Sequence, residues 1–131
     1  MTKKKILIVD DEPEQIEFAA MVMQENGYIP ISASDGKEGM KKVHTEKPDL
    51  ILLDILMPEK GGLGMYKDLK QNEETRNIPV VIVTGVVRGG DFQDRMIRQD
   101  GNLPPPDGYI EKPMNPDAVG KLVNDLLSYD E

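Results

Sequence analysis

Three aspartates stand directly after two short aliphatic runs of the chain. Asp10 and Asp11 follow Ile6–Val9, and Asp54 follows Leu50–Leu53. An uninterrupted apolar run of this length is typical of a strand buried on both faces, as in a parallel sheet. Because a lone buried carboxylate is costly, we interpret the three acids as one site, gathered where neighbouring strands end.

Carboxylates that lie close together raise one another's pKa values, and a divalent cation relieves this conflict. Oxygen ligands without histidine or cysteine nearby favour Mg²⁺, or Mn²⁺ in its place, over zinc. A carboxylate can also act as a nucleophile and form an aspartyl phosphate. Phosphoryl transfer further needs positive charge and hydrogen-bond donors, which Thr84 and Lys112 could supply from the ends of two further strands.

Each of these residues also has an ordinary structural explanation. An acid after a strand often caps the next helix, which would account for Asp11, and Asp54 could equally be structural. Thr84 taken alone is typical of a turn, and Lys112 taken alone is typical of an exposed charge. Their combination at the ends of four different strands is what favours a shared site.

The elements that must position these residues alternate along the chain. Pro13, Ser34–Gly36 and Asn115–Pro116 are typical helix starts, and Asn26–Gly27 is a typical helix stop. Strands are expected at 5–9, 28–33, 49–54, 80–84 and 109–112, with helices after Pro13, after Gly36, near Leu63–Gln71, after Asp91 and after Pro116.

This alternation predicts an α/β fold with a doubly wound parallel sheet of five strands and helices on both faces. Right-handed crossovers restrict its topology. A common solution has the strand order 2-1-3-4-5, with ligands bound beyond the carboxyl ends of strands 1 and 3. Asp10, Asp11 and Asp54 fall at those two ends.

Length and composition restrict the class of protein. The 131 residues fit one domain, 1–131, that can bury a substantial core. No apolar run approaches the ~20 residues of a membrane span, and Ile6–Val9 is too short for a signal peptide. The absence of cysteine excludes disulfides and thiolate catalysis. A net charge of −8 argues against nucleic acid as a partner. We expect a cytoplasmic protein without a membrane or nucleic-acid partner.

Two further features have structural explanations. His44 is too isolated to form a metal site and is interpreted as a solvated helix residue. Pro104–Pro106 favours polyproline II and is interpreted as part of an ordered loop rather than as a partner-binding motif.

The chain resembles the receiver domains of two-component response regulators, in particular the stand-alone, chemotaxis-regulator-like kind. The resemblance implies the flavodoxin-like form of the fold and covers almost the whole chain. The matching segments are Ile8–Pro13, Pro48–Asp54, Met57–Pro58, Pro79–Gly85 and Tyr109–Pro113.

The resemblance implies a nucleophile and a metal site. Asp54 would accept the phosphoryl group. Asp11 would bind Mg²⁺ directly, with Asp10 assisting, often through water. Asp54 and the backbone carbonyl of Leu56 would complete the protein's share of the ligands.

The resemblance also implies residues that stabilise and report the phosphoryl group. Lys112 would pair with the phosphoryl oxygens, and Thr84 would hydrogen-bond them. Tyr109 would be the switch aromatic whose rotamer follows Thr84. The peptide bond between Lys112 and Pro113 is expected to be cis.

The implied function is a phosphorylation-dependent signalling switch. A sensor histidine kinase or a phosphotransfer protein would pass a phosphoryl group from a phosphohistidine to Asp54. Phosphorylation would then shift the populations of the conformations of one surface. This surface is formed by the helix after Asp91, the strand 109–112 and the last helix. This surface would bind a downstream protein or a second copy of the chain. The protein would catalyse only its own phosphorylation and dephosphorylation, and would not otherwise be an enzyme.

The sequence departs from the family pattern at some positions, and other functions compete with the signalling switch. The span from Thr84 to Lys112 is longer than usual, with the surplus in Gly101–Gly108, which alters the expected output surface. Leu56 and Val86 are apolar, which predicts slow self-dephosphorylation. The main alternative is a degenerate receiver that binds partners without phosphorylation. A hydrolase that forms an aspartyl phosphate would need an extra acid–base residue and a substrate cap, and the sequence indicates neither. A flavodoxin-like FMN carrier is disfavoured because the acids after the first strand would repel the phosphate of FMN.

Overall fold

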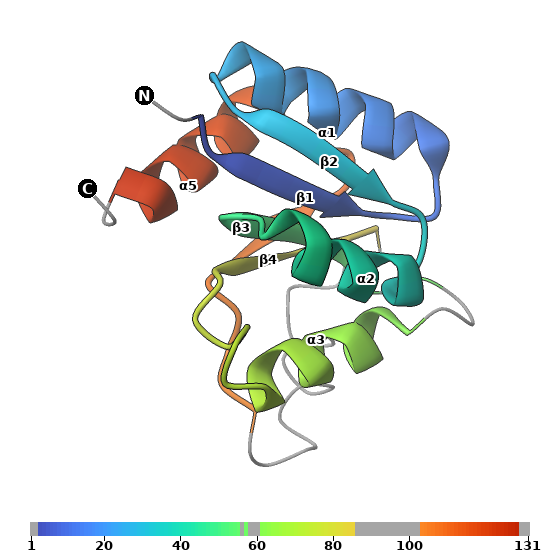
Figure 1. Ribbon diagram of the computed structural model, residues 1–131. Helices are drawn as coiled ribbons and strands as arrows, with labels where there is room; N and C mark the ends of the chain where they lie inside the picture. Colours follow the sequence, from blue (N-terminus) through green and yellow to red (C-terminus); the bar gives the residue numbers. More distant parts are fainter. Residues whose placement is uncertain (1–2, 56, 58–60, 86–102, 129–131) are drawn as a thin grey trace.

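The computed structural model describes residues 3–55, 57, 61–85 and 103–128 (Figure 1). The helix expected after Asp91 and the backbone carbonyl of Leu56 lie outside these residues. The described strands are β1 (Lys5–Val9), β2 (Ile29–Ala33), β3 (Leu50–Asp54), β4 (Val80–Thr84) and β5 (Gly108–Glu111). The described helices, labelled as in Figure 1, are α1 (Pro13–Glu25), α2 (Gly36–Glu46), α3 (Gly62–Gln71) and α5 (Pro116–Ser128).

The strands form one parallel sheet in the order β2-β1-β3-β4-β5, which confirms the predicted topology. The register places Val9 beside Leu53, and Thr84 beside Glu111. The residues that follow β1 and β5 therefore reach the same edge of the sheet as the ends of β3 and β4. Strands β3 and β4 are buried at every position, because helices cover both faces of the sheet.

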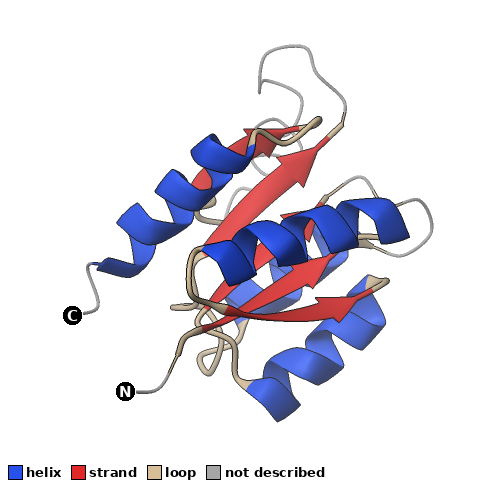
Figure 2. Cartoon of the chain, turned by 90° about the horizontal axis from the view of Figure 1, so that it is seen from above, coloured by secondary structure: helices blue, strands red, loops and turns tan. Residues whose placement is uncertain are grey.

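The helices form a layer on each face of the sheet (Figures 1 and 2). Helices α1 and α5 pack on the face that carries Ile6 and Ile8. Helices α2 and α3 pack on the opposite face, which carries Leu7 and Val9. This alternation follows from the strand period of two and divides the apolar core into two clusters, one under each helical layer.

Side-chain caps fix where two helices begin, as the sequence indicates. Asp35 caps α2 by accepting a hydrogen bond from the Glu38 amide at 2.8 Å. The Glu38 carboxylate in turn accepts the Ser34 amide at 2.6 Å, so the chain is held on both sides of the cap. Asn115 accepts the amides of Asp117 and Ala118 at the start of α5. These caps satisfy backbone N–H groups that have no partner inside the helix.

The described part of the proline-rich segment, 103–107, is fastened to the domain. The buried Tyr66 of α3 donates its hydroxyl to the Pro104 carbonyl at 2.6 Å. Asp107 forms two contacts with Val80, one from its backbone N–H to the Val80 carbonyl and one from the Val80 N–H to its side chain, both at 2.9 Å. These contacts support the interpretation of this segment as an ordered loop.

The other differences from the expected elements are small. Strands β2, β3 and β5 each begin one residue from the predicted boundary, and β5 also ends one residue before it. His44 is exposed on α2, as expected. Of the helices in the described part of the chain, none is long and apolar enough to cross a bilayer.

Candidate functional site

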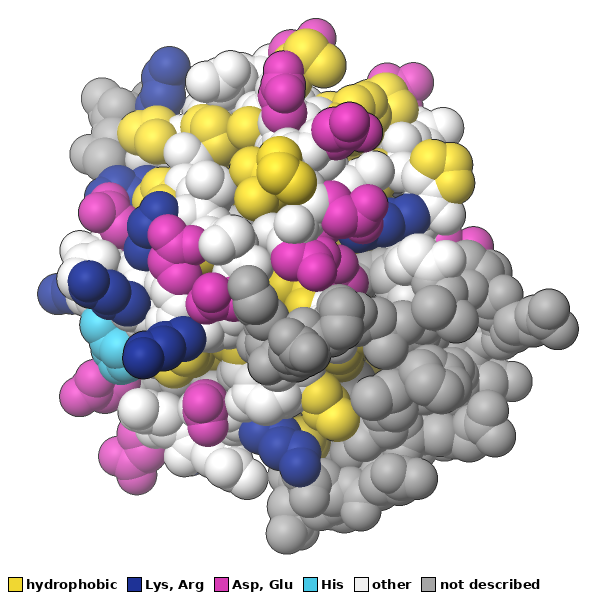
Figure 3. Space-filling view, turned by 90° about the vertical axis from the view of Figure 1, so that its right-hand side faces the viewer, with side chains coloured by type: hydrophobic (Ala, Val, Ile, Leu, Met, Phe, Trp, Pro, Cys, Tyr) yellow, Lys and Arg dark blue, Asp and Glu magenta, His cyan; other side chains and the backbone are white. Residues whose placement is uncertain are grey.

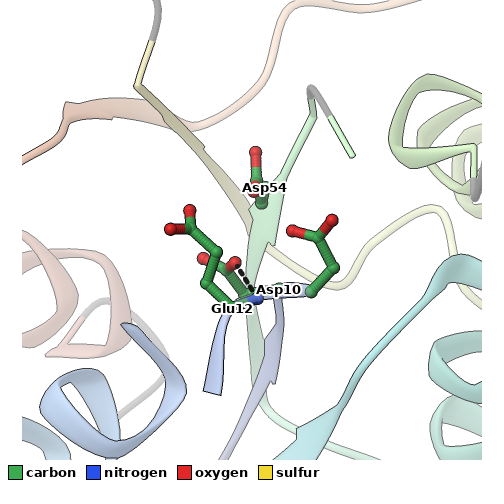
Figure 4. Close-up of side chains that lie close together, drawn as sticks. Asp10, Glu12 and Asp54 are labelled. Carbon is green, nitrogen blue, oxygen red and sulfur yellow. Dashed lines mark hydrogen bonds between the residues drawn. The ribbon is translucent and has the colours of Figure 1, made fainter. Parts of the chain in front are cut away.

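The predicted acids come together at the carboxyl edge of the sheet. Asp54 is the last residue of β3, and Asp10 follows β1, its hydrogen-bonded neighbour in the sheet. Figure 4 shows Asp10, Glu12 and Asp54 converging on one another from these two strand ends. Figure 3 views the side toward which β1 and β2 point in Figure 1, where acidic side chains spread over the described surface.

Four carboxylates form a compact group at this edge. Asp10, Asp11, Glu12 and Asp54 each offer an oxygen, and these oxygens all lie within 4.8 Å of one another. Asp10 and Asp54 are buried, whereas Asp11 and Glu12 are exposed. An all-oxygen donor set that is partly buried and partly open to water suits a hard divalent cation, which keeps some of its water ligands.

Lys112 provides the positive charge of the site. Its Nζ lies 2.9 Å from Asp10 Oδ2, 3.0 Å from Glu12 Oε1 and 3.2 Å from Asp54 Oδ2. Burial alone would lower the pKa of Lys112, but the carboxylates of Asp10, Glu12 and Asp54 outweigh it and hold the pKa above its usual value. The lysine therefore stays charged and balances part of the negative charge of the acids.

Backbone pairing places Thr84 and Lys112 on the same edge. The Lys112 amide donates to the Thr84 carbonyl at 2.7 Å, which continues the pairing of β4 and β5 by one residue. Thr84 is buried, and Gly85 lies against the aliphatic stem of Lys112. The peptide bond between Lys112 and Pro113 is cis.

Tyr109 is partly solvent-exposed on β5, with 37% of its surface accessible. It pairs with Ile82 of β4, two positions before Thr84. The predicted switch aromatic, Tyr109, therefore lies on the strand next to the one that carries the predicted switch threonine, Thr84. The backbone carbonyl of Leu56, a further predicted ligand, lies outside the described residues.

The first residue of α3 packs tightly beneath the chain that carries Asp54. A Cβ atom added at Gly62 would clash with the Asp54 carbonyl oxygen and would lie 2.7 Å from Cα of Ile55. The helix can approach the backbone this closely because position 62 has no side chain. Gly62 therefore helps to set the position of the nucleophile candidate.

Sequence reasoning had not included Glu12 in the site. It lies next to two predicted ligands and directly before Pro13, where an acid is also expected because it complements the dipole of the helix that begins there. In the structure its side chain reaches Lys112, which belongs to the far edge of the sheet. That contact depends on the tertiary arrangement of β1 and β5.

The fold and the site together define a receiver domain. Five parallel strands in this order carry acids after β1, an aspartate at the end of β3, a threonine at the end of β4 and a lysine after β5. The chain belongs to the response regulator receiver domain family, whose sequence model matches residues 6–124. Members of this family are the response regulators of two-component signalling systems.

Curated relatives include regulators of two different lengths. The chain is 34% identical over 126 residues to the polar-differentiation response regulator DivK of Brucella anthropi, covering 96% of this chain and 95% of DivK. It is 35% identical over 128 residues to the alkaline phosphatase synthesis transcriptional regulatory protein PhoP of Bacillus subtilis. That match covers 98% of this chain but only 50% of PhoP, so the chain spans about half of this longer relative.

Solved structures share the fold. The receiver domain of a signal transduction histidine kinase from Syntrophus aciditrophicus has a TM-score of 0.81 and 31% identity, over 95% of this chain and 90% of that one. The chemotaxis protein CheY4 of Vibrio cholerae has a TM-score of 0.79 at 23% identity, over 95% of this chain and 98% of that one, and shows the fold alone. The predicted flavodoxin-like fold is therefore confirmed.

Proposed function

We propose that this chain, residues 1–131 as a single domain, is a phosphorylation-dependent signalling switch in which Asp54 accepts a phosphoryl group in a Mg²⁺-dependent reaction. The donor would be a phosphohistidine on a sensor histidine kinase or phosphotransfer protein in the cytoplasm. The observation that carries the proposal is the buried Asp54 carboxylate, held 3.2 Å from the Lys112 ammonium within a group of four acids.

The acids have distinct proposed roles. Asp10, Asp11 and Asp54 would hold Mg²⁺, or Mn²⁺ in its place, together with the Leu56 carbonyl. When bound, the cation would offset negative charge on the carboxylates and on the incoming phosphoryl group. An Asp54 oxygen would attack phosphorus, and the Lys112 ammonium, 3.2 Å from Asp54 Oδ2, would help to hold the carboxylate in place.

The remaining residues would stabilise and report the modification. Lys112 would donate hydrogen bonds to the phosphoryl oxygens, since its ammonium already lies beside the acceptor carboxylate. Thr84, at the buried end of β4, would donate its hydroxyl to the same group. Its movement would be followed by Tyr109 on the adjacent strand, and the altered surface around β5 and α5 would bind a downstream protein or a second copy of the chain.

The test is the mass gained on incubation with Mg²⁺ and a small acyl-phosphate donor. Wild type should gain one phosphoryl group, and Asp54→Ala should gain none. Asp68→Ala, which removes an exposed acid from α3, is the matched control and should behave as wild type. Absence of a mass gain in wild type would instead favour a degenerate receiver that binds partners without phosphorylation.

A further inference from the structure

Three carboxylates surround the Lys112 ammonium before any phosphoryl group arrives, two of them hydrogen-bonded to it and one ion-paired with it. A lysine ammonium has three N–H donors. Carboxylate oxygens of Asp10, Glu12 and Asp54 surround it at 2.9, 3.0 and 3.2 Å. Phosphorylation would convert the Asp54 carboxylate into an acyl phosphate, so that Lys112 loses this acceptor and gains phosphoryl oxygens, for which its contacts with Asp10 and Glu12 would compete.

Asp10 and Glu12 differ in what the loss of their contact with Lys112 would cost. The side chains of Asp10 and Asp54 are only 4% and 7% exposed, whereas that of Glu12 is 60% exposed. A buried carboxylate that loses a charged partner is strongly penalised, whereas an exposed one is solvated by water. Glu12 is therefore the partner that Lys112 can exchange at the lowest free energy.

The local structure leaves the Glu12 side chain able to move. Glu12 occupies the N-cap position of α1 with extended backbone, at φ −102° and ψ 112°. Within the described chain its side chain caps no backbone N–H of α1. Its backbone is held separately, because its amide donates to Asp10 Oδ1 at 2.9 Å. The carboxylate can leave Lys112 without disturbing the helix start or the buried aspartate.

We propose that Glu12 is the exchangeable partner of Lys112, and that its carboxylate occupies the place which a phosphoryl oxygen takes on phosphorylation. The inference rests on the proposed function. In that reaction an Asp54 oxygen forms a bond to phosphorus, the bond from phosphorus to the donor breaks, and an acyl donor leaves as a carboxylate. Lys112 keeps its proton throughout, and Glu12 moves into water as an anion.

This exchange predicts that Glu12 competes with the phosphoryl group. Glu12→Gln removes the charge from the competitor. Glu12→Asp retains the charge but is one methylene shorter, which withdraws the carboxylate from Lys112. Aspartate is also a favourable N-cap residue, so this variant should not lose stability. Glu14→Gln makes the same charge change within the first turn of α1 and is the matched control.

The experiment measures binding of trifluoroberyllate, a phosphoryl mimic, at saturating Mg²⁺ by fluorine NMR. The rate of mass gain with an acyl-phosphate donor is followed in parallel. Both Glu12 variants should bind the mimic about three- to tenfold more tightly than wild type, and Glu14→Gln should remain within about twofold of wild type. Melting temperatures without mimic or donor check that all variants are folded.

Each other outcome overturns the inference in a distinguishable way. Equal affinities in all variants would show that Glu12 does not compete. Tighter binding in Glu12→Gln alone would assign the effect to net charge rather than to the contact with Lys112. Weaker binding in both Glu12 variants would make Glu12 a supporting ligand. Failure of wild type to bind the mimic or to gain mass would overturn the proposed function itself, and the inference with it.

Discussion

Lys112 and Asp54 are 58 positions apart in the chain, yet the lysine Nζ lies 3.2 Å from the aspartate Oδ2. The parallel register brings them together, because β3, β4 and β5 all end at one edge of the sheet. This edge concentrates negative charge, and Asp54 shares the basic partner Lys112 with Asp10 and Glu12. Stability and cation binding should therefore be linked through this lysine.

Replacing Lys112 with methionine should destabilise the domain and strengthen its response to Mg²⁺. Removing one partner of a buried ion pair leaves its carboxylates uncompensated, at a cost on the order of 3 kcal/mol. Mg²⁺ binds the native acid group and should raise the melting temperature more in the variant than in wild type, because the ammonium no longer competes. Thermal unfolding with and without millimolar Mg²⁺ measures both effects.

The control for this variant is Lys121→Met. The Lys121 side chain is 77% exposed and pairs with Asp125 one helical turn away, so its replacement should change the free energy of unfolding by less than about 0.5 kcal/mol. Equal Mg²⁺ responses in Lys112→Met and wild type would contradict competition between the lysine and the cation. The complete absence of a Mg²⁺ shift in wild type would argue against an assembled metal site.

Two glycines of α3 should respond to alanine with opposite signs. Gly62→Ala places a methyl group against the Asp54 carbonyl and the Ile55 backbone, and overpacking of this kind costs about 1–3 kcal/mol. Gly64 has open space around it, so Gly64→Ala should stabilise the helix by up to about 1 kcal/mol. Urea unfolding measures both, and similar changes in the two variants would contradict the close approach at Gly62.

Tyr66→Phe should loosen the attachment of the proline-rich segment. The variant keeps the buried ring but removes the hydroxyl that donates to the Pro104 carbonyl. The expected loss is about 1 kcal/mol in the free energy of unfolding, with faster amide exchange at Asp107. Tyr28→Phe is the control, since its hydroxyl bonds to Asn124 at an exposed site and its loss should matter less. Unchanged exchange at Asp107 in Tyr66→Phe would show that this hydroxyl does not fasten the segment.

Glu38→Gln should reveal a pH-dependent contribution at the start of α2. The Ser34 amide, which donates to the Glu38 carboxylate, is the main cause that holds the pKa of Glu38 below its ordinary 4.5. The charged form is therefore favoured by folding, and its stabilisation is present above pH 4.5 and lost as the pH falls through the lowered value.

The difference in unfolding free energy between wild type and Glu38→Gln should thus be largest near neutral pH and shrink in acid. Chemical unfolding at a series of pH values measures it. Glu17→Gln, on the exposed side of α1, makes the same change in net charge elsewhere. If the difference in unfolding free energy between wild type and Glu38→Gln stayed constant from neutral to acidic pH, the contribution of the Glu38 carboxylate would be ruled out.

Local patterns were sufficient to predict the sheet and the placement of its acids. The aliphatic runs before Asp54 and Thr84 become strands buried at every position. Because parallel strands end at a common edge, the position of an acid along its own strand predicted which acids would meet. The helix caps Asp35 and Asn115 were also predictable, since a cap acts on amides within three residues.

Contacts between distant side chains were not predictable in the same way. Glu12 contacts Lys112 from the opposite end of the sequence, and no local period or cap relates the two. The hydrogen bond from Tyr66 to Pro104 likewise depends on how the segment before β5 lies on α3. Such contacts need a tertiary arrangement that sequence spacing does not specify.

The two contacts between Asp107 and Val80 fix the alignment of β5 against β4 directly before β5 begins. Lys112 follows from that point after a short run of residues that pair with β4, so the alignment of β5 on β4 sets the reach of the lysine to Asp54. The charge relationship at the sheet edge is therefore established where β5 begins, at the opposite end of this strand from the lysine itself.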